Sequence, residues 1–436
     1  MEDKHRAAVT AYLANAELAP VPTPTPRDER LREVPGKAEA VIGMRRVGKS
    51  WLLRARQREL LDAGVPRSRM LHVEFEDERL ADLRLEHLQL LEEAFYLRHP
   101  ESHAAECWYF FDEIQNVPGW ERFVRRLLSD RRLHVAITGS SAKLLSTEIA
   151  TAMRGRALTI ELWPFSFRET LRHRGVEVPT QWPVPATIES RLRNEFARYL
   201  EVGGFPEIQD VDGDLRRPIL RDYLDVVILR DIVERHSVRN VPLLRAVVRR
   251  LIRSVGCLAS VHALARDLKS QGFTFGKDAV YELMGHVEDA FLAKLLSVDT
   301  QSERRRQVNP RKVYVVDHAL ARAASPTAES DVGHALENIV YLELRRRGEV
   351  HGYHVSPSGR EVDFVASDDQ QRRTLVQVCA TIEEPQTRER ELTALAEAIE
   401  QTNIEQAVIV TLATAGEEQV AGHRVRVVPA WRWLLE

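Results

Sequence analysis

Apolar residues in the first 140 positions form short runs that are separated by segments with helical spacing. The runs cover residues 40–42, 70–75, 108–111 and 134–138, and each has the length of a buried strand. Strands that alternate with helices favour a parallel sheet with helices on both faces, so the pattern predicts an α/β core. We also expect helices over residues 1–18 and 81–98. The connector 19–29 is predicted to be extended, because its alternating prolines exclude a helix.

The periodicity changes after residue 187. Residues 188–240 have helical spacing without strand-like runs. Three helical segments, 242–255, 259–270 and 276–288, then precede a two-stranded hairpin with a basic loop, which together predict a winged helix. The last part begins with a helix and continues in short strands, which is typical of a small α/β domain. The predicted parts are the lead-in (1–37), the α/β core (38–187), the helical region (188–240), the winged helix (241–325) and the C-terminal domain (326–436).

Composition adds few constraints. The 436 residues suffice for several domains, and the net charge of −3 gives no global basic field that would point to nucleic acid. The three cysteines, Cys107, Cys257 and Cys379, lie far apart, form no metal-type pair and suit a reducing cytosol. The N-terminus lacks a signal-peptide core, and no apolar run approaches membrane-spanning length. These features predict a cytoplasmic protein without a membrane partner.

Residues 43–50, GMRRVGKS, match the phosphate loop G-x-x-x-x-G-K-[ST] of nucleoside triphosphatases and lie between a predicted strand and a predicted helix. Successive backbone N–H groups in such a loop, together with the helix N-terminus, attract phosphate. Lys49 is expected to reach the β- and γ-phosphates, and Ser50 to bind Mg²⁺. A surface Gly-Lys turn is the alternative. The residues predicted to bind the nucleotide are Gly43, Arg46, Val47, Gly48, Lys49, Ser50 and Trp51.

Four apolar residues precede Asp112 and Glu113, as in a Walker B strand. Asp112 is predicted to hold Mg²⁺ through water, and Glu113 to polarise the attacking water. Thr138 ends the next strand, where it could orient that water or sense the γ-phosphate, unless it only caps the loop. Arg154 and Arg156 follow. Either of them could supply an arginine finger, often to a neighbouring subunit, or form a surface salt bridge.

The stretches "GMRRVGKS", "FFDEIQNVPGWERFVRRL", "ITGSSAKLLSTEIATAMRGRALTIELWPFSFRE" and "EVGGFPEI" together resemble the prokaryotic AAA-type ATPases of the archaeal-ATPase branch. The resemblance covers nearly the whole chain from about residue 38. It implies a P-loop AAA-type core that binds and hydrolyses ATP, a winged helix, and a C-terminal domain related to the PD-(D/E)xK restriction-endonuclease folds. We expect a homo-oligomer through the ATPase core, with Mg²⁺ as cofactor. The proline-rich segment departs from the more regular helical lead-in of the family.

The same resemblance implies a nuclease site of a helix Glu, a strand Asp and a [D/E]-x-K motif. Glu337 and Asp363 match the first two positions, whereas Gln377 and Cys379 stand where an acid and a lysine belong. Phosphodiester cleavage needs oxygen ligands for a hard cation and a positive group near the attacking water. Since no lysine follows Lys312, the domain has no substitute of its own, and we expect a degenerate nuclease fold that serves binding or assembly.

The predicted hairpin loop, SERRRQVNPRK, is strongly basic. Its cations could neutralise DNA phosphates, or the loop could be solvated or dock on another domain. They are Arg304, Arg305, Arg306, Arg311 and Lys312. The leading interpretation is therefore an ATP-hydrolysing switch coupled to DNA contact or to a protein partner. The alternatives are a non-hydrolysing, ATP-bound module that recognises a partner, and an ATP-gated DNA nuclease, which the missing lysine disfavours.

Overall fold

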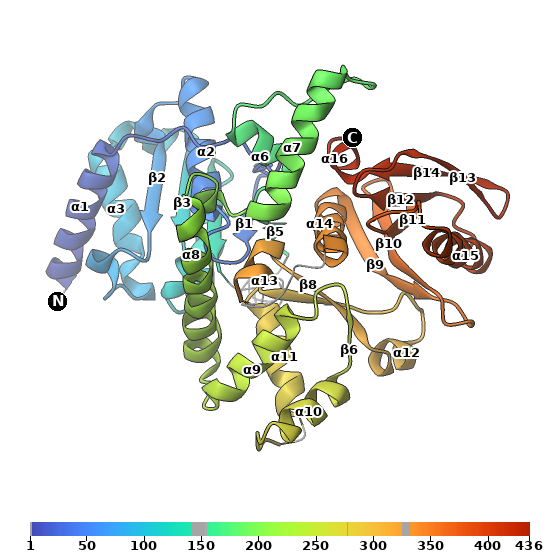
Figure 1. Ribbon diagram of the computed structural model, residues 1–436. Coiled ribbons are helices and arrows are strands. Elements are labelled where there is room, and N and C mark those ends of the chain that lie inside the picture. The colour runs from blue at the N-terminus through green and yellow to red at the C-terminus, as the bar shows by residue number, and fades with distance from the viewer. Residues whose placement is uncertain (1, 141–152, 154, 277, 325–331) are drawn as a thin grey trace. The chain divides into compact units, whose positions relative to one another are not determined.

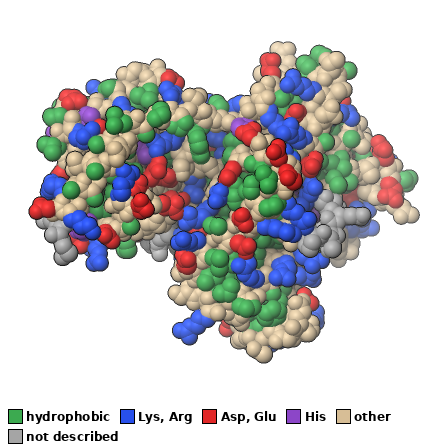
Figure 2. Space-filling view, turned by 60° about the vertical axis from the view of Figure 1, so that its left-hand side comes forward, with side chains coloured by type: hydrophobic (Ala, Val, Ile, Leu, Met, Phe, Trp, Pro, Cys, Tyr) green, Lys and Arg blue, Asp and Glu red, His purple; other side chains and the backbone are tan. Residues whose placement is uncertain are grey.

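The computed structural model of the chain describes residues 2–140, 153, 155–276, 278–324 and 332–436. It contains two compact units, Met1–Trp163 and Pro164–Glu436 (Figure 1). Within the described ranges, no helix combines the length and the apolar character needed to cross a membrane. On the face shown in Figure 2, basic and acidic side chains are interspersed, in keeping with the net charge of −3.

A five-stranded sheet forms the centre of the first unit. All its pairings are parallel. Its strands are β1 (Ala38–Ile42), β2 (Met70–Glu74), β3 (Cys107–Asp112), β4 (Leu133–Gly139) and β5 (Ala157–Glu161), in the order β2-β3-β4-β1-β5. Strands β1 and β3 are buried along their whole length, which explains their continuous apolar runs. The predicted α/β class and the first four strands are confirmed, whereas β5 was not predicted.

Helices connect these strands. They are α1 (Glu2–Leu18), α2 (Lys49–Asp62) after β1, α3 (Gln89–Arg98) between β2 and β3, and α4 (Trp120–Leu127) between β3 and β4. Helix α1 confirms the first predicted helix, and its Tyr12 hydroxyl accepts a hydrogen bond from the backbone N–H of Glu74 at 2.8 Å. The helix predicted over 81–98 is shorter than expected, because a 3₁₀ turn at Leu85–His87 precedes α3.

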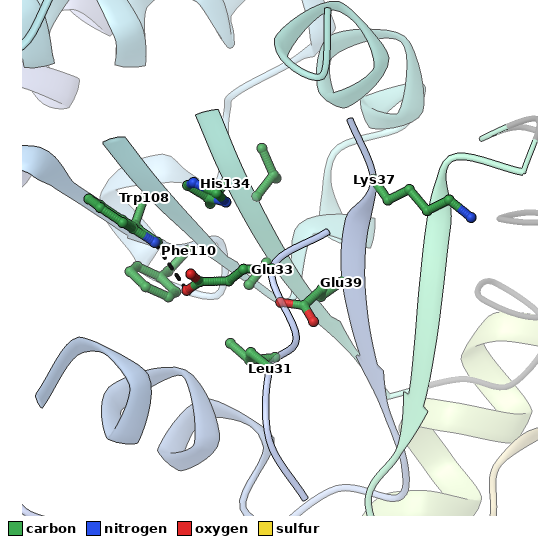
Figure 3. Close-up of a pocket in the computed structure, with 9 residues that line it drawn as sticks. Leu31, Glu33, Lys37, Glu39, Trp108, Phe110 and His134 are labelled. Carbon is green, nitrogen blue, oxygen red and sulfur yellow. Dashed lines mark hydrogen bonds between the residues drawn. The ribbon is translucent and has the colours of Figure 1, made fainter. Parts of the chain in front are cut away.

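The strap, residues 19–37, joins α1 to β1 without a helix, as its prolines predict. It is held on the sheet by polar contacts. The Glu33 carboxylate accepts hydrogen bonds from Trp108 Nε1 at 3.0 Å and from Arg56 Nε at 2.5 Å. Figure 3 shows Glu33 and Leu31 of the strap beside Trp108 and His134 of the sheet. The strap is therefore an ordered part of the first unit.

Helices dominate the beginning of the second unit. They are α6 (Phe167–His173), α7 (Ala186–Val202), α8 (Gly213–Val226) with a π-helical continuation (Val227–Glu234), and, later in the chain, α13 (His318–Ala324). The glycine pair in "EVGGFPEI" allows close packing here. A Cβ at Gly203 would overlap the Asp317 carboxylate, and one at Gly204 would overlap the Phe165 carbonyl. The Gly204 N–H donates to Asp317 Oδ2 at 2.6 Å.

A small antiparallel sheet with the strand order β6-β8-β7 follows. Its elements, in chain order, are α9 (Val241–Ile252), β6 (Leu258–Ala259), α10 (Val261–Ser270), α11 (Ala279–Asp289), β7 (Ala293–Leu296), α12 (Glu303–Val308) and β8 (Arg311–Val315). The three predicted helices and the hairpin are confirmed. The basic loop differs from the prediction because it contains the short helix α12, which Ser302 caps. That this part is a winged helix stays a prediction.

The C-terminal part contains a six-stranded mixed sheet in the order β13-β14-β12-β11-β10-β9. Its elements are α14 (Val332–Arg347), β9 (Gly348–Val355), β10 (Glu361–Asp368), β11 (Arg373–Val378), α15 (Pro385–Thr402), β12 (Ala407–Thr411), β13 (Gly416–Val420), β14 (His423–Pro429) and α16 (Ala430–Trp433). The core joins α15 to the sheet through the fully buried Leu395, Val365, Leu375 and Ile409. The predicted helix and four strands are confirmed, whereas α15, α16, β13 and β14 were not predicted. The five predicted domain boundaries stay predictions.

Candidate functional site

The loop of residues 43–50 joins the C-terminal end of β1 to α2 and has a strained backbone. Gly43 has φ +151°, and a Cβ there would overlap the backbone carbonyl oxygen of Leu162, so only glycine fits. Gly48 is left-handed at φ 99°, and so is the non-glycine Arg46 at φ 68°. Left-handed residues within a turn direct successive backbone N–H groups to one side, where they form a cradle for an anion.

Lys49, the first residue of α2, directs its ammonium back into this loop. The side chain is 4% exposed, and Nζ donates to the carbonyl oxygens of Gly43 and Met44, both at 3.2 Å. Nζ also lies 3.5 Å from Glu113 Oε1. The structure therefore brings together the loop lysine and the second acid of the β3 motif, two predicted site residues that lie far apart in the chain.

Asp112, at the end of β3, accepts hydrogen bonds from the hydroxyl groups of Ser50 and Thr138. Burial raises the pKa of Asp112 to about 6, an effect that the neighbouring Glu113 strengthens and that both hydroxyls and Lys49 oppose. Ser50 and Asp112 thus offer adjacent oxygen atoms of the kind that Mg²⁺ prefers. These residues fit the predicted Mg²⁺ site.

Glu113 is held in an unusual backbone conformation at φ 51°. Burial acts to raise the pKa of its carboxyl, but Lys49, Arg45 and Gln115 together lower it below its usual value. Gln115 Nε2 donates to Glu113 Oε2. Gln115 was not predicted, although its place two residues after the acid in "DEIQ" was visible in the sequence. The carboxylate therefore stays ionised and oriented, as the proposed polarisation of water requires.

Thr138, at the end of β4, links the two acids. Its fully buried hydroxyl donates to Asp112 Oδ1 and accepts from the backbone N–H of Glu113 at 2.9 Å. Because its one proton is given to Asp112, Thr138 cannot at the same time donate to a water molecule or a phosphate. The geometry therefore favours a positioning role for Thr138 over the predicted contact with the reacting groups.

Two other residues predicted to bind the nucleotide, Val47 and Trp51, differ in their exposure. Val47 is fully buried, and its carbonyl oxygen accepts from Arg27 Nη1 at 2.9 Å. Arg27 belongs to the strap and also donates to the Trp163 carbonyl at 2.6 Å, a contact for which no sequence pattern provides a signal. Trp51 is 54% exposed on α2. The strap thus holds the phosphate loop in place through the hydrogen bond from Arg27 to Val47.

The two arginine-finger candidates have different outcomes. Arg154 lies outside the described residues. Arg156 is exposed and immediately precedes β5, so it lies at the N-terminal edge of the parallel sheet, opposite the edge that carries the phosphate loop. A strand of five residues separates the two edges by roughly 16 Å. Arg156 therefore does not belong to the site of its own chain.

Glu337 and Asp363 surround a lysine that was predicted to contact DNA, and together they form what is called here the C-terminal cluster. Lys312, expected among the DNA-contacting cations, is 3% exposed, and its Nζ donates to Glu337 Oε1 at 2.9 Å and to Asp363 Oδ1 at 2.7 Å. Burial opposes its charge, yet the carboxylates of Asp363, Glu337 and Glu361 hold the pKa of Lys312 well above its usual value. One prediction is thus corrected, because Lys312 is not a surface cation. The domain has no lysine of its own at this place, as predicted, but Lys312 reaches the acidic cluster from outside it.

The remaining basic residues of the hairpin do not form one group. Arg304, Arg305 and Arg306 are exposed on α12, where Arg306 pairs with Glu303 at 2.9 Å. Arg311, on β8, is only partly exposed and lies 3.9 Å from Glu288 and over the ring of Tyr281. The exposed basic surface of the hairpin is therefore limited to the three arginines of α12.

Comparison with known proteins agrees with this geometry. A family model described as "AAA domain" matches residues 36–171, and one described as a domain of unknown function matches residues 193–331. The first match covers the part of the chain that holds the parallel sheet and the phosphate loop. A likeness to the Walker-type ATPase PABY2304 of Pyrococcus abyssi has a TM-score of 0.41 at 17% identity and covers 66% of this chain and 90% of that chain. At that level it adds no argument.

Two relatives define the family. The chain is 33% identical over 447 residues to an uncharacterized protein of Methanocaldococcus jannaschii, with 100% of this chain and 96% of the relative covered. It is 30% identical over 335 residues to an uncharacterized protein of Haemophilus influenzae, with 75% and 79% covered. The chain belongs to the family of these proteins.

Proposed function

We propose that the chain binds ATP with Mg²⁺ at residues 43–50 and hydrolyses it with the help of Glu113. The observation that carries the proposal is the convergence of Lys49, Ser50, Asp112 and Glu113 at one edge of the sheet. Three strand ends, those of β1, β3 and β4, meet there, which is where parallel α/β sheets bind ligands. The AAA-domain match over residues 36–171 supports the same function.

The contacts within the site suggest how binding prepares hydrolysis. Mg²⁺ bound near Ser50 and Asp112 would offset phosphate charge. Lys49 now lies against Glu113, so its ammonium has to exchange this carboxylate for phosphate oxygens when ATP enters. The exchange frees Glu113 to orient water, while Gln115 limits its movement. Phosphoryl transfer depends mainly on such positioning and charge stabilisation.

Hydrolysis by this site would involve a second subunit. Arg156 is exposed at the far edge of the sheet in its own chain, a place from which it could serve only a neighbour's phosphate loop. We therefore expect a homo-oligomer that forms through the ATPase core. Arg154 is the alternative to Arg156 as the arginine finger. Glu113→Gln and Arg156→Ala should each be inactive alone, and mixing the two proteins should restore turnover. Mixtures without activity would remove Arg156 as a finger acting in trans.

The three arginines of α12 support a second component, contact with DNA phosphates. Their side chains are exposed together on one short helix next to a β-hairpin, an arrangement consistent with the predicted winged helix. ATP turnover would then switch this surface. The observation that favours a hydrolysing switch over an ATP-bound partner module is the ionised, oriented Glu113. A module that only holds ATP has no need for that carboxylate.

The proposal is tested by ATP binding and turnover. We expect Lys49→Ala to lose tight binding of ATP because the loop loses its buried cation. Lys37→Ala, which removes a strap lysine outside the loop, serves as the matched control and should bind as the parent does. A parent protein that binds ATP but releases no phosphate, alone or with duplex DNA, would favour the partner-binding module. Equal ATP affinity in the parent and in Lys49→Ala would contradict the site itself.

A further inference from the structure

A buried ammonium group lies where carboxylates from two other elements converge. Lys312 comes from β8, Glu337 from α14, and Glu361 and Asp363 from β10. The Lys312 Nζ lies 2.9 Å from Glu337 Oε1, 2.7 Å from Asp363 Oδ1 and 2.6 Å from Glu361 Oε1. One cation is thus shared by three acids, two of which are almost completely buried. The contact ties the small antiparallel sheet to the C-terminal sheet.

The buried acids Glu337 and Asp363 also accept hydrogen bonds from groups other than Lys312. The Tyr314 hydroxyl, two residues along β8 from Lys312, donates to Glu337 Oε1 at 2.6 Å. Asp363 Oδ2 accepts from the backbone N–H of Val378 at 2.8 Å. Gln377, the residue in the third motif position, accepts from the Asp363 N–H at 3.3 Å and donates to Glu391. The cluster is therefore a connected hydrogen-bonded network around the ammonium.

The ammonium and a divalent cation would compete for one space. Glu337 Oε1 and Asp363 Oδ1 are the inward-facing oxygens, and a metal bound to both would lie about 2.0–2.6 Å from each. The Nζ of Lys312 is within 2.9 Å of both oxygens, so a metal in that position would overlap it. Lys312 must leave before a divalent ion can use this pair of acids.

We propose that Lys312 is the resident cation of the Glu337–Glu361–Asp363 cluster, where it excludes divalent metal ions and fastens the small sheet to the C-terminal domain. A buried charge is tolerated only when it is paired, so the acids and the lysine depend on each other. The C-terminal domain then binds β8, and the three carboxylates of the cluster hold the Lys312 ammonium in place of a metal ion. The proposal does not depend on ATP hydrolysis by the first unit.

The first test measures binding of Mn²⁺. All the proteins compared carry Asp112→Asn, so that Mn²⁺ bound at the phosphate-loop site does not contribute to the signal. We expect the Lys312→Ala protein to bind Mn²⁺ at least about tenfold more tightly than the Lys312 parent, since a truncated side chain leaves space and unpaired carboxylates. Adding Asp363→Asn to Lys312→Ala should abolish the gain. Equally tight Mn²⁺ binding by the Lys312 parent, lost on Asp363→Asn, would overturn the proposal and indicate a working metal site.

A second test covers the case in which Lys312→Ala does not fold. Lys312→Met keeps most of the side-chain volume but removes the charge, so it should lower the melting temperature of the second unit. Combining it with Glu337→Gln and Asp363→Asn removes charge on both sides and should recover most of that loss. A triple variant that melts no higher than Lys312→Met would show that the ammonium does not stabilise the protein through these acids.

Discussion

Replacing Asp112 by Asn should stabilise the protein when neither nucleotide nor Mg²⁺ is bound. Asp112 is 6% exposed, and burial raises the pKa of its carboxyl from 3.8 to about 6. At neutral pH the folded protein therefore holds a charge that the unfolded chain accommodates more easily. Asparagine has the same shape and keeps an acceptor for the hydrogen bond from Thr138, but it carries no charge.

The size of the effect follows from the two pKa values. A difference of roughly two units corresponds to about 3 kcal/mol of unfolding free energy at pH 7.5, because one unit is worth about 1.4 kcal/mol. The carboxyl with the raised folded-state pKa lowers the parent's stability progressively as pH rises from about 4 to about 6. The advantage of Asp112→Asn should therefore be about half as large at pH 5 and disappear below about pH 4.

Hydrogen exchange measures the change in stability at individual amides. A local measurement is needed because the two units of the chain need not unfold together. The slowest amides of β3 should exchange more slowly in Asp112→Asn than in the parent at pH 7.5, in a metal-chelating buffer, with a smaller difference at pH 5. Asp62→Asn, which changes an exposed aspartate on α2, is the matched control and should have no effect. Faster exchange in Asp112→Asn, or a gain that does not change between pH 5 and 7.5, would refute the reasoning.

Three further outcomes are expected. Lys49→Ala should fail to bind ATP tightly in equilibrium dialysis, since its ammonium is the buried cation that donates to the loop carbonyls of Gly43 and Met44. Thr138→Val should keep ATP binding but lower turnover by roughly 10-fold or more, because both acids lose the hydroxyl that positions them; unchanged turnover would show that Thr138 is dispensable. Changing Arg304, Arg305 and Arg306 together to Ala should make the slope of log K for duplex DNA against log salt less negative by about two to three. An unchanged slope would show that these arginines do not contact DNA phosphates.

The phosphate loop and the acids of β3 could be predicted because each depends on a short stretch of sequence. The glycines of residues 43–50 satisfy a local backbone requirement, and the apolar run before Asp112 marks a strand that is buried on both faces. Parallel strands end at one edge, so the proximity of Lys49 and Glu113 followed from the fold class. Strands β3 and β4 pair in the sheet, so Thr138 lies at the same edge.

The C-terminal cluster could not be predicted in this way. Lys312 is 25 positions before Glu337 and 51 before Asp363, and no spacing rule relates them. Its place in a basic loop suggested DNA contact, with a solvated or docked loop as the alternatives, whereas its environment is set by tertiary packing. Helix α15 is a different case, because its signals were present in the sequence although the helix was not predicted. Pro385 opens it, and Leu395 and Ile399 have the spacing of one buried helical face.

Phosphate release by the pure protein tests the central claim most directly. With ATP and Mg²⁺, the parent should turn over repeatedly, whereas Glu113→Gln should retain bound, unhydrolysed ATP and release phosphate at least about 10²-fold more slowly. The substitution preserves the size of the side chain and removes only the charge that Lys49 and Gln115 hold in place. Phosphate release at the same rate in both proteins would contradict the assignment of Glu113 and, with it, the proposed ATPase site.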